Sequence, residues 1–412
     1  MEFQYFDSSG CGFPKPNVPI LPPPTRQSFG GKRHRSLSES SRIEGSFIQM
    51  RKSLGARTYS RGRYALYEAY RLASVGKSGA LLAPSYHCIT MLDPALRLNA
   101  EIDLYPLLPD LSPDLDAIAK HLRSRRTPAK ALLATHYFGF PQEFSALATL
   151  CAEHGISLIE DCSHALFSSA SKLGNEAVRA LGETGQYAIA SPYKFFSTED
   201  GGFFWTNDGA QAATEAQRQP SPIVELKGAL SAFRRTRESL PLPEIDSIVS
   251  EINAVTRGNR PMGIDIRREN NAPSNYYQPP QEGVRSLISS RWIIRHTDVT
   301  RLANNRRRNY QLWVAAVAGL PHCRPLLPHL PKDCVPYMFP LFIENASARF
   351  NILKHLGLPV WRWDEMATSS CSVAASYRLN LLHLPCHQEL TAGQMSWMTS
   401  VVSHVMRTQL IA

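Results

Sequence analysis

The chain has 412 residues, of which 43% are hydrophobic and 19% charged, a composition that is typical of globular proteins and excludes a fibrous or wholly disordered chain. A chain of this length usually folds as about two or three domains. It contains no run of about 18 apolar residues, so we expect no membrane span. Its eight cysteines are scattered without a C-x-x-C pair, and no apolar signal segment is visible. These features predict a cytoplasmic protein with reduced thiols.

The net charge of +10 is concentrated at the beginning of the chain. Prolines, serines and the basic run Lys32–Arg35 predict that residues 1–45 form a flexible basic arm. The arm is either a solvated tail or a contact for an acidic partner, such as a membrane surface or a nucleotide phosphate. Alternatively, Ile20, Leu21 and Phe29 pack on the large domain and only residues 32–42 are free. It lacks interleaved aromatic residues, so we expect no nucleic-acid binding.

The next part of the chain alternates between two patterns. Short apolar runs predict buried strands, and helical periods lie between several of them. This alternation is typical of an α/β fold with a mostly parallel sheet covered on both faces. The predicted strands are 80–83, 102–105, 131–135, 156–159, 187–190 and 203–205, and the predicted helices are 63–75, 89–98, 115–122 and 143–154.

The remainder of the chain is less regular. Residues 208–290 are polar with weak periodicity, and we interpret them as surface helices and loops. A long helix is expected to begin near Asp298, followed by apolar segments at 337–343, 346–356 and 391–406. We therefore predict a large domain over residues 46–290 and a smaller α+β domain over residues 291–412.

Two common kinds of site lack support. Gly76-Lys77-Ser78 resembles the end of a P-loop, but Arg71 stands where that motif needs its first glycine. The thirteen histidines include no H-E-x-x-H, so we expect no catalytic metal.

Three segments together favour a site for a phosphate-bearing cofactor with an electron-poor ring. Ser60-Arg61-Gly62-Arg63 precedes a predicted helix, where Ser60 is a plausible cap. Gly62 would let backbone N–H groups approach an anion at the helix N-terminus, and Arg63 would add a cation. We expect Asp161 and His164, which follow a predicted strand, to face the ligand edge of the sheet.

The third segment contains a lysine with apolar neighbours. Lys194 lies among Tyr193, Phe195 and Phe196, in the connection between two predicted strands. Partial desolvation would lower the pKa of its amine and make it a nucleophile suited to a Schiff base. Gly201-Gly202 then opens the next strand.

With these segments, the chain resembles the DegT/DnrJ/StrS family of sugar aminotransferases, which are fold type I enzymes dependent on pyridoxal 5′-phosphate. The resemblance begins near residue 46 and rests on A-P-S-Y-H-C-I-T (83–90), T-H-Y-F-G-F-P (135–141), I-E-D-C-S-H-A (159–165), the Lys194 segment and L-P-C-H-Q-E-L (384–390). It implies a large domain with a mostly parallel sheet between helices and a smaller C-terminal α+β domain.

The resemblance also implies roles for individual residues. Lys194 would carry the cofactor covalently, Asp161 would pair with its ring nitrogen, and His164 would contact its ring hydroxyl. Ser191 would contact the phosphate. The aromatic residue that covers the cofactor ring in the family would fall near Cys88, so Tyr86 or His87 is expected to take that role.

The implied activity is transfer of an amino group, from a donor such as glutamate, to a nucleotide-linked keto-sugar in polysaccharide or glycoconjugate biosynthesis by a homodimer. Family members that act as sugar dehydratases have histidine in place of the lysine, so Lys194 favours the aminotransferase. The alternative is a pyridoxal-fold protein without turnover that acts as a binding or regulatory partner.

Overall fold

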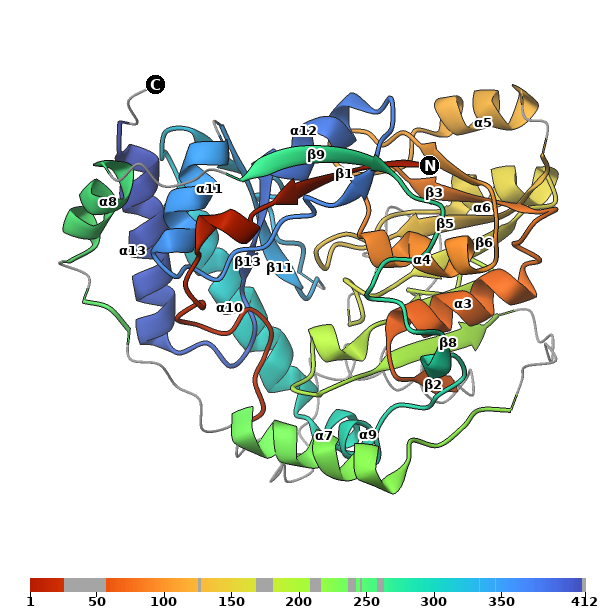
Figure 1. Ribbon diagram of the computed structural model, residues 1–412, viewed down its shortest axis with the longest axis horizontal. Helices are drawn as coiled ribbons and strands as arrows, with labels where there is room; N and C mark the ends of the chain where they lie inside the picture. Colours follow the sequence, from red (N-terminus) through yellow and green to blue (C-terminus); the bar gives the residue numbers. More distant parts are fainter. Residues whose placement is uncertain are drawn as a thin grey trace.

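The computed structural model describes residues 1–25, 57–124, 127–167, 181–207, 216–235, 242–244, 247–257, 263–332, 334–344 and 346–409. Within these ranges the chain forms one large α/β sheet unit and a C-terminal α+β unit, which lie side by side (Figure 1). The fold confirms the predicted α/β class. No helix in the described ranges has both the length and the hydropathy that a membrane span requires.

The large sheet has seven strands in the order β2-β8-β7-β6-β5-β3-β4. The strands from β4 to β7 are parallel, whereas β8 runs antiparallel to both β7 and β2. The bounds are β2 Arg57–Tyr59, β3 Ala80–Pro84, β4 Ile102–Tyr105, β5 Ala129–Thr135, β6 Ser157–Asp161, β7 Tyr187–Ala190 and β8 Gly202–Thr206. All six predicted strands are therefore present, with shifts of one or two residues at some ends.

Successive residues of each strand serve two different cores, which explains the continuous apolar runs. Leu81, Leu133 and Ile159 pack with helices α3 and α4, whereas Leu82 and Leu158 belong to a second core on the opposite face. The helices that accompany these strands are α3 Gly62–Leu72, α4 Ile89–Arg97, α5 Leu115–Ser124 and α6 Ser145–Glu153. Parallel strands in such a sheet direct their carboxyl ends to one edge.

The C-terminal unit contains a three-stranded antiparallel sheet in the order β10-β11-β13, with helices around it (Figure 1). Helix α10 begins after the N-cap Asp298, whose side chain accepts a hydrogen bond from the Arg301 amide, as the predicted start near Asp298 requires. The elements are α10 Val299–Val317, β10 Cys323–Pro325, β11 Met338–Ile343, α11 Ala346–His355, α12 Ser372–Asn380, β13 Leu381–Pro385 and α13 Ala392–Arg407.

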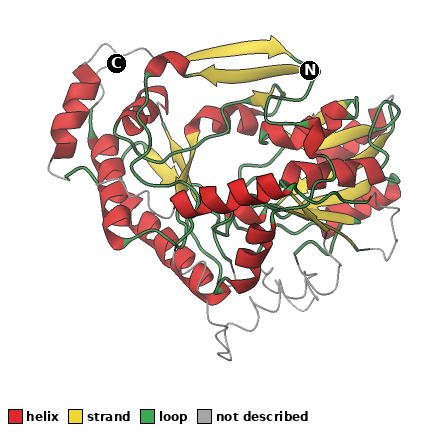
Figure 2. Cartoon of the chain, turned by 60° about the horizontal axis from the view of Figure 1, so that its bottom comes forward, coloured by secondary structure: helices red, strands yellow, loops and turns green. Residues whose placement is uncertain are grey.

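The prediction of a flexible arm is wrong for residues 1–25. Strand β1 (Glu2–Asp7) is the central strand of a third sheet, between β9 (Ile264–Glu269) and β12 (Met366–Ala367), and Figure 2 shows the β1–β9 ribbon at the edge of the molecule. Phe3 and Val18 are buried, and Ile20 packs against the core of the large sheet. The basic run Lys32–Arg35 lies outside the described residues.

Residues 208–290 contain the expected surface helix but also elements that were not expected. They contain α7 (Pro222–Arg235), α8 (Ile248–Arg257) and strand β9, and α9 (Ile288–His296) follows. Ile248 and Ile252, one helical turn apart, are buried in the core of the C-terminal unit. Helix α8 was expected to belong to the large domain. It packs on the C-terminal unit instead, because its apolar face is buried in the core of that unit. The boundary at residue 290 stays a prediction.

Candidate active site

A cavity of about 360 Å³ lies at the carboxyl edge of the parallel strands. Thr135, Asp161 and Ser191 stand at or just beyond the ends of β5, β6 and β7 and line one wall. The opposite wall comes from the C-terminal unit and includes Tyr337, the segment 361–365 and His383. The cavity therefore lies where the two units meet.

Six of the eight predicted site residues line this cavity: Gly62, Arg63, Asp161, His164, Ser191 and Lys194. They come from segments that are far apart in the sequence. The sheet brings them together because the parallel strands β6 and β7 end beside each other, and α3 begins next to them.

The N-terminus of helix α3 forms a compact cradle at one end of the cavity. The helix begins at Gly62, and its N-cap residue is Arg61, which makes no side-chain capping hydrogen bond. The predicted cap Ser60 is therefore wrong, because its backbone is held in extended pairings with Val284 and Gly201. An uncapped helix N-terminus leaves amide groups available to an anion.

Close packing in this cradle leaves little room for a side chain at Gly62. A Cβ atom at this position would overlap the hydroxyl of Ser191. The Ser191 hydroxyl lies 2.9 Å from that of Ser163, and both side chains are buried. Two hydroxyls beside free helix amides fit the oxygens of a phosphate group. Ser163 was not among the predicted residues, although it lies between Asp161 and His164 in the same motif.

Asp161 and Arg63 have defined positions around the cradle. Asp161 is 4% exposed, and its Oδ1 accepts a hydrogen bond of 2.8 Å from the amide of Ser163. The guanidinium of Arg63 donates a hydrogen bond to the carbonyl of Tyr276 and lines the cavity. A buried carboxylate at the end of β6 is placed to pair with a protonated ring nitrogen of a bound cofactor.

Lys194 ends a short 3₁₀ helix (η2, Pro192–Lys194) between β7 and β8. Its Nζ lies 5.5 Å from the centre of the Tyr337 ring. Its apolar neighbours Phe195 and Phe196 are fully buried against Phe167, so they fix the backbone and leave the lysine directed to the cavity. The lysine is half-buried, as a reactive amine at a cavity wall requires.

Two imidazoles lie close to this amine. Burial, followed by the charge of Lys194, lowers the pKa of His383 to about 3. The same causes, with a further contribution from His383, hold the pKa of His164 well below its usual value. The His164 ring packs 4.4 Å from the Tyr337 ring. Both histidines are therefore neutral near pH 7 and can take part in hydrogen bonds without adding charge.

The predicted ring contact by Tyr86 or His87 is not supported, because neither residue lines the cavity. The Tyr86 hydroxyl bonds the Nε2 atom of His383 at 2.8 Å, and His87 Nε2 accepts a hydrogen bond from the amide of Ala367. Both side chains are thus used in contacts with the C-terminal unit. Cys88, the residue before α4, lines the cavity in their place.

The cavity residues of the C-terminal unit, among them Tyr337, Trp363 and His383, were not predicted from the sequence. The indole of Trp363 lies 4.8 Å from the Tyr86 ring and 5.5 Å from the His164 ring. The sequence contains no local signal for these residues, because their role depends on how the two units pack.

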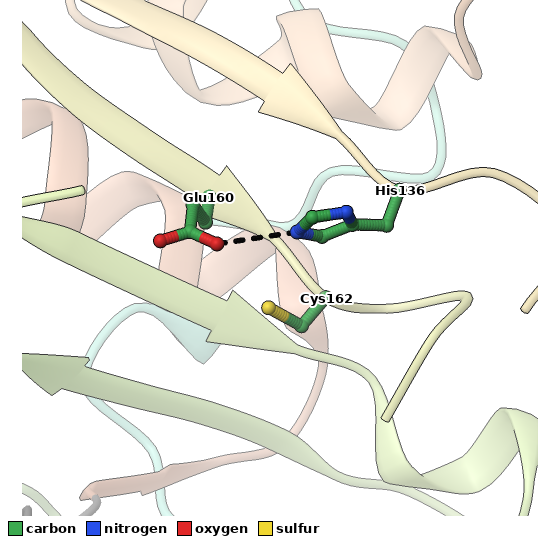
Figure 3. A group of neighbouring side chains, drawn as sticks. All are labelled: His136, Glu160 and Cys162. Atoms are coloured by element: carbon green, nitrogen blue, oxygen red, sulfur yellow. Dashed lines mark hydrogen bonds and ion pairs between the residues drawn. The ribbon is translucent and has the colours of Figure 1, made fainter. Parts of the chain in front are cut away.

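A buried group of His136, Glu160 and Cys162 lies at the ends of β5 and β6 (Figure 3). Its nitrogen and oxygen atoms already have partners: Glu160 accepts hydrogen bonds from His136 Nε2 and from the amides of residues 182, 184 and 185. His136 Nδ1 accepts from the amide of Gln142, so Nε2 carries the proton. The group braces the loop before β7 and has no spare nitrogen or carboxylate ligand for a metal.

Comparison with known proteins agrees with this geometry. Residues 26–229 match the model of the DegT/DnrJ/EryC1/StrS aminotransferase family. The chain is 30% identical over 178 residues to the dTDP-4-dehydro-2,3,6-trideoxy-D-glucose 4-aminotransferase of Saccharopolyspora spinosa, which covers 43% of this chain and 44% of that protein. It is 24% identical over 361 residues to the GDP-perosamine synthase of Vibrio cholerae, which covers 82% of this chain and 90% of that protein.

The chain is also 24% identical over 149 residues to the UDP-N-acetyl-3-dehydro-alpha-D-glucosamine 3-aminotransferase of Acidithiobacillus ferrooxidans. The matches to this protein and to the S. spinosa enzyme span less than half of their length, 38% and 44%. Solved structures show the same fold at low identity. Helicobacter pylori PseC, an aminotransferase of pseudoaminic acid biosynthesis, has a TM-score of 0.60 at 16% identity, covering 96% of this chain and 99% of that chain. The PLP form of the Streptococcus pneumoniae sugar aminotransferase Spr1654 has a TM-score of 0.62 at 12% identity, with coverages of 95% and 98%. The fold, the motif residues around the cavity and the family match together show that the chain belongs to the DegT/DnrJ/EryC1/StrS aminotransferase family.

Proposed function

We propose that the protein is a pyridoxal 5′-phosphate-dependent aminotransferase that moves an amino group, from glutamate, to a nucleotide-linked keto-sugar in polysaccharide or glycoconjugate biosynthesis. The observation that carries the proposal is the placement of Lys194 and Asp161 in one cavity beside the α3 cradle. The relatives that are named as sugar aminotransferases support the substrate class. Cytoplasmic location and a homodimer are parts of the same proposal.

The cavity residues fit this cofactor. The α3 amides, Gly62, Arg63 and the hydroxyls of Ser163 and Ser191 would hold the phosphate. Asp161 would pair with the ring nitrogen, and His164 would contact the ring hydroxyl. When bound, the cofactor supplies an electron sink for the bonds at the substrate's amino-bearing carbon.

Lys194 would perform two tasks in this arrangement. It would hold the cofactor covalently until the amino donor arrives, and its released Nζ would then move a proton to and from the substrate carbon. The neutral imidazoles of His164 and His383 keep positive charge away from this amine. Tyr337, below the amine, shields it from solvent on one side.

The fold alone does not separate this activity from sugar dehydration. The structure is also similar to that of the GDP-4-keto-6-deoxymannose-3-dehydratase ColD, with a TM-score of 0.55 at 16% identity. Lys194 supports the aminotransferase because a primary amine can carry the cofactor covalently, which an imidazole cannot.

The proposal is tested by reducing the purified protein with borohydride and mapping the pyridoxyl adduct by peptide mass spectrometry. We expect the adduct on Lys194, and visible absorbance that is bleached by glutamate. Lys194→Ala should lose both, whereas Lys227→Ala, which changes an exposed lysine on α7, should keep both. An adduct on another lysine, or bleaching by glutamate in Lys194→Ala, would contradict the assignment.

A further inference from the structure

A second cavity, of about 430 Å³, lies beside helix α9 and the strands β2 and β8. It shares no lining residue with the cavity that contains Lys194. Three arginines line it, Arg285, Arg291 and Arg295, together with Trp292 and Ile288. Among the residues that the structure describes, no acidic side chain lines it.

The three guanidinium groups have no hydrogen bond or salt bridge with any residue that the structure describes. The Nε atom of Arg285 is buried without a partner. A buried donor that lacks an acceptor costs free energy, which a bound acceptor would restore. Arginine presents its donors in a fixed fork that matches the oxygens of a phosphate.

The two carboxylates whose charge acts on Arg291, Glu225 and Asp200, accept hydrogen bonds from backbone groups. Both oxygens of Glu225 lie 3.0–3.1 Å from the amide of Ile288, and those of Asp200 lie 3.1–3.3 Å from the amide of Leu287. The pKa of Arg291 is lowered, first by burial and then by the charge of Arg285. The cavity thus has an excess of positive charge, which an anion would relieve.

An exposed apolar surface adjoins these cations. Trp292 is 41% exposed and Ile288 is 60% exposed. The indole is held by stacking on His296, with ring centres 4.3 Å apart, so its orientation is fixed. An oriented aromatic ring beside arginines fits a ligand that has both a flat ring and phosphates.

We propose that this cavity is a second ligand site, which takes a nucleoside diphosphate. The diphosphate lies among Arg285, Arg291 and Arg295, and the base packs against Trp292. The site goes beyond the proposed aminotransferase reaction, because it holds neither the cofactor cradle nor Lys194. Nucleotide binding at this site is measured directly, so the test does not depend on amino-transfer activity.

The test uses the enzyme loaded with cofactor, so that the α3 cradle is filled. Isothermal titration calorimetry with uridine diphosphate and with inorganic pyrophosphate compares the wild type with Arg291→Gln/Arg295→Gln. We expect saturable binding of both probes, weakened about tenfold or more in the double variant. Trp292→Ala should weaken binding of uridine diphosphate and leave that of pyrophosphate unchanged. Arg407→Gln, which removes an exposed arginine on α13, should bind as the wild type does.

The alternatives give different results. Wild-type binding that the double variant retains would place the nucleotide in another cavity and overturn the proposal. The proposal would also be overturned if the wild type shows no saturable binding and the double variant changes its oligomeric state in sedimentation velocity. That result would assign the arginines to an interface between copies of the chain. Equal effects of Trp292→Ala on both probes would refute the proposed contact with the base.

Discussion

Arg306 is a fully buried cation that connects the Lys194 segment to the C-terminal unit. Its guanidinium donates to the carbonyls of Lys194, Pro336 and Tyr337 and to the side-chain oxygen of Gln388, at 2.8–3.2 Å. Burial lowers its pKa to about 10, so it stays charged near neutral pH. Because it bonds carbonyls on both sides of the cavity, Arg306 fixes the distance between Lys194 and the Tyr337 ring.

A change at Asp161 tests the residue that would hold the cofactor ring. Asp161→Asn keeps an oxygen for the Ser163 amide but removes the negative charge. We expect cofactor binding to weaken by about 1.5–3 kcal/mol, the contribution of a charged hydrogen bond, and turnover to fall further. Cofactor dissociation constants and amino-transfer rates measure the two effects.

The matched control is Asp116→Asn, which changes an exposed aspartate in the first turn of α5 and should alter neither quantity. Unchanged turnover in Asp161→Asn would mean that another group contacts the ring nitrogen.

At the scale of elements, strand β1 connects the beginning of the chain to two distant segments. It pairs with β9 from Glu2↔Glu269 to Asp7↔Ile264, and Phe3 and Gln4 pair with β12. Segment 361–365, which lines the cavity, directly precedes β12. The ribbon of β1 and β9 therefore supports the C-terminal wall of the active site from outside.

Removal of a single side chain from β1 should show this support. Phe3 is 1% exposed in the core beneath α3 and α4, so Phe3→Ala should lower the free energy of unfolding by about 3–5 kcal/mol. Glu2→Ala, which changes an exposed neighbour, should change it by less than about 1 kcal/mol. Urea unfolding of the two variants measures the difference, and equal stability would show that the Phe3 side chain does not anchor β1 in this core.

At the scale of the whole molecule, several neutral histidines are buried at the junction of the units. Burial lowers the pKa of His87 to about 4, and those of His383 and His387 to about 3. In the unfolded chain these groups titrate near 6.5. Below that pH the unfolded chain binds more protons than the folded protein, so unfolding becomes more favourable.

Stability should therefore fall as the pH decreases from about 6.5 towards 4. Each of these histidines contributes at most about 1.4 kcal/mol per pH unit in this window. Asp200 acts in the opposite direction, because burial raises its pKa to about 6 and its stabilisation is lost as the pH rises from 3.8 through 6. Burial also raises the pKa of Asp93, Asp364, Glu365 and Glu389, which start from 3.8 or 4.5 and therefore act at the acid end of this window. The histidines titrate near 6.5 in the unfolded chain, so we expect the net slope to be positive between pH 5 and pH 7.

Urea unfolding at pH 7 and pH 5 checks the sign of this slope. The ring of His387 bonds the carbonyl of Pro19 through Nε2. His387→Asn removes this titrating group, so it should reduce the slope of the free energy of unfolding against pH by the contribution of one histidine. A midpoint that is higher at pH 5 than at pH 7 would show that the buried carboxyl groups dominate.

The sequence by itself determined the α/β alternation between residues 80 and 206 and the residues Gly62, Asp161, His164, Ser191 and Lys194 that line the cavity. The alternation follows from local periodicity, and Asp161 and His164 follow from the convergence of parallel strand ends at one edge of a sheet. Gly62 follows from its place at a helix N-terminus and Lys194 from its apolar neighbours, whereas Ser191 was implied by the family resemblance. Only the tertiary structure decided the pairing of β1 with β9 and β12, the replacement of Tyr86 and His87 by Cys88 at the cavity wall, and the contribution of Tyr337 and His383. These features depend on contacts between residues hundreds of positions apart, for which hydrophobic periodicity within a short window carries no information.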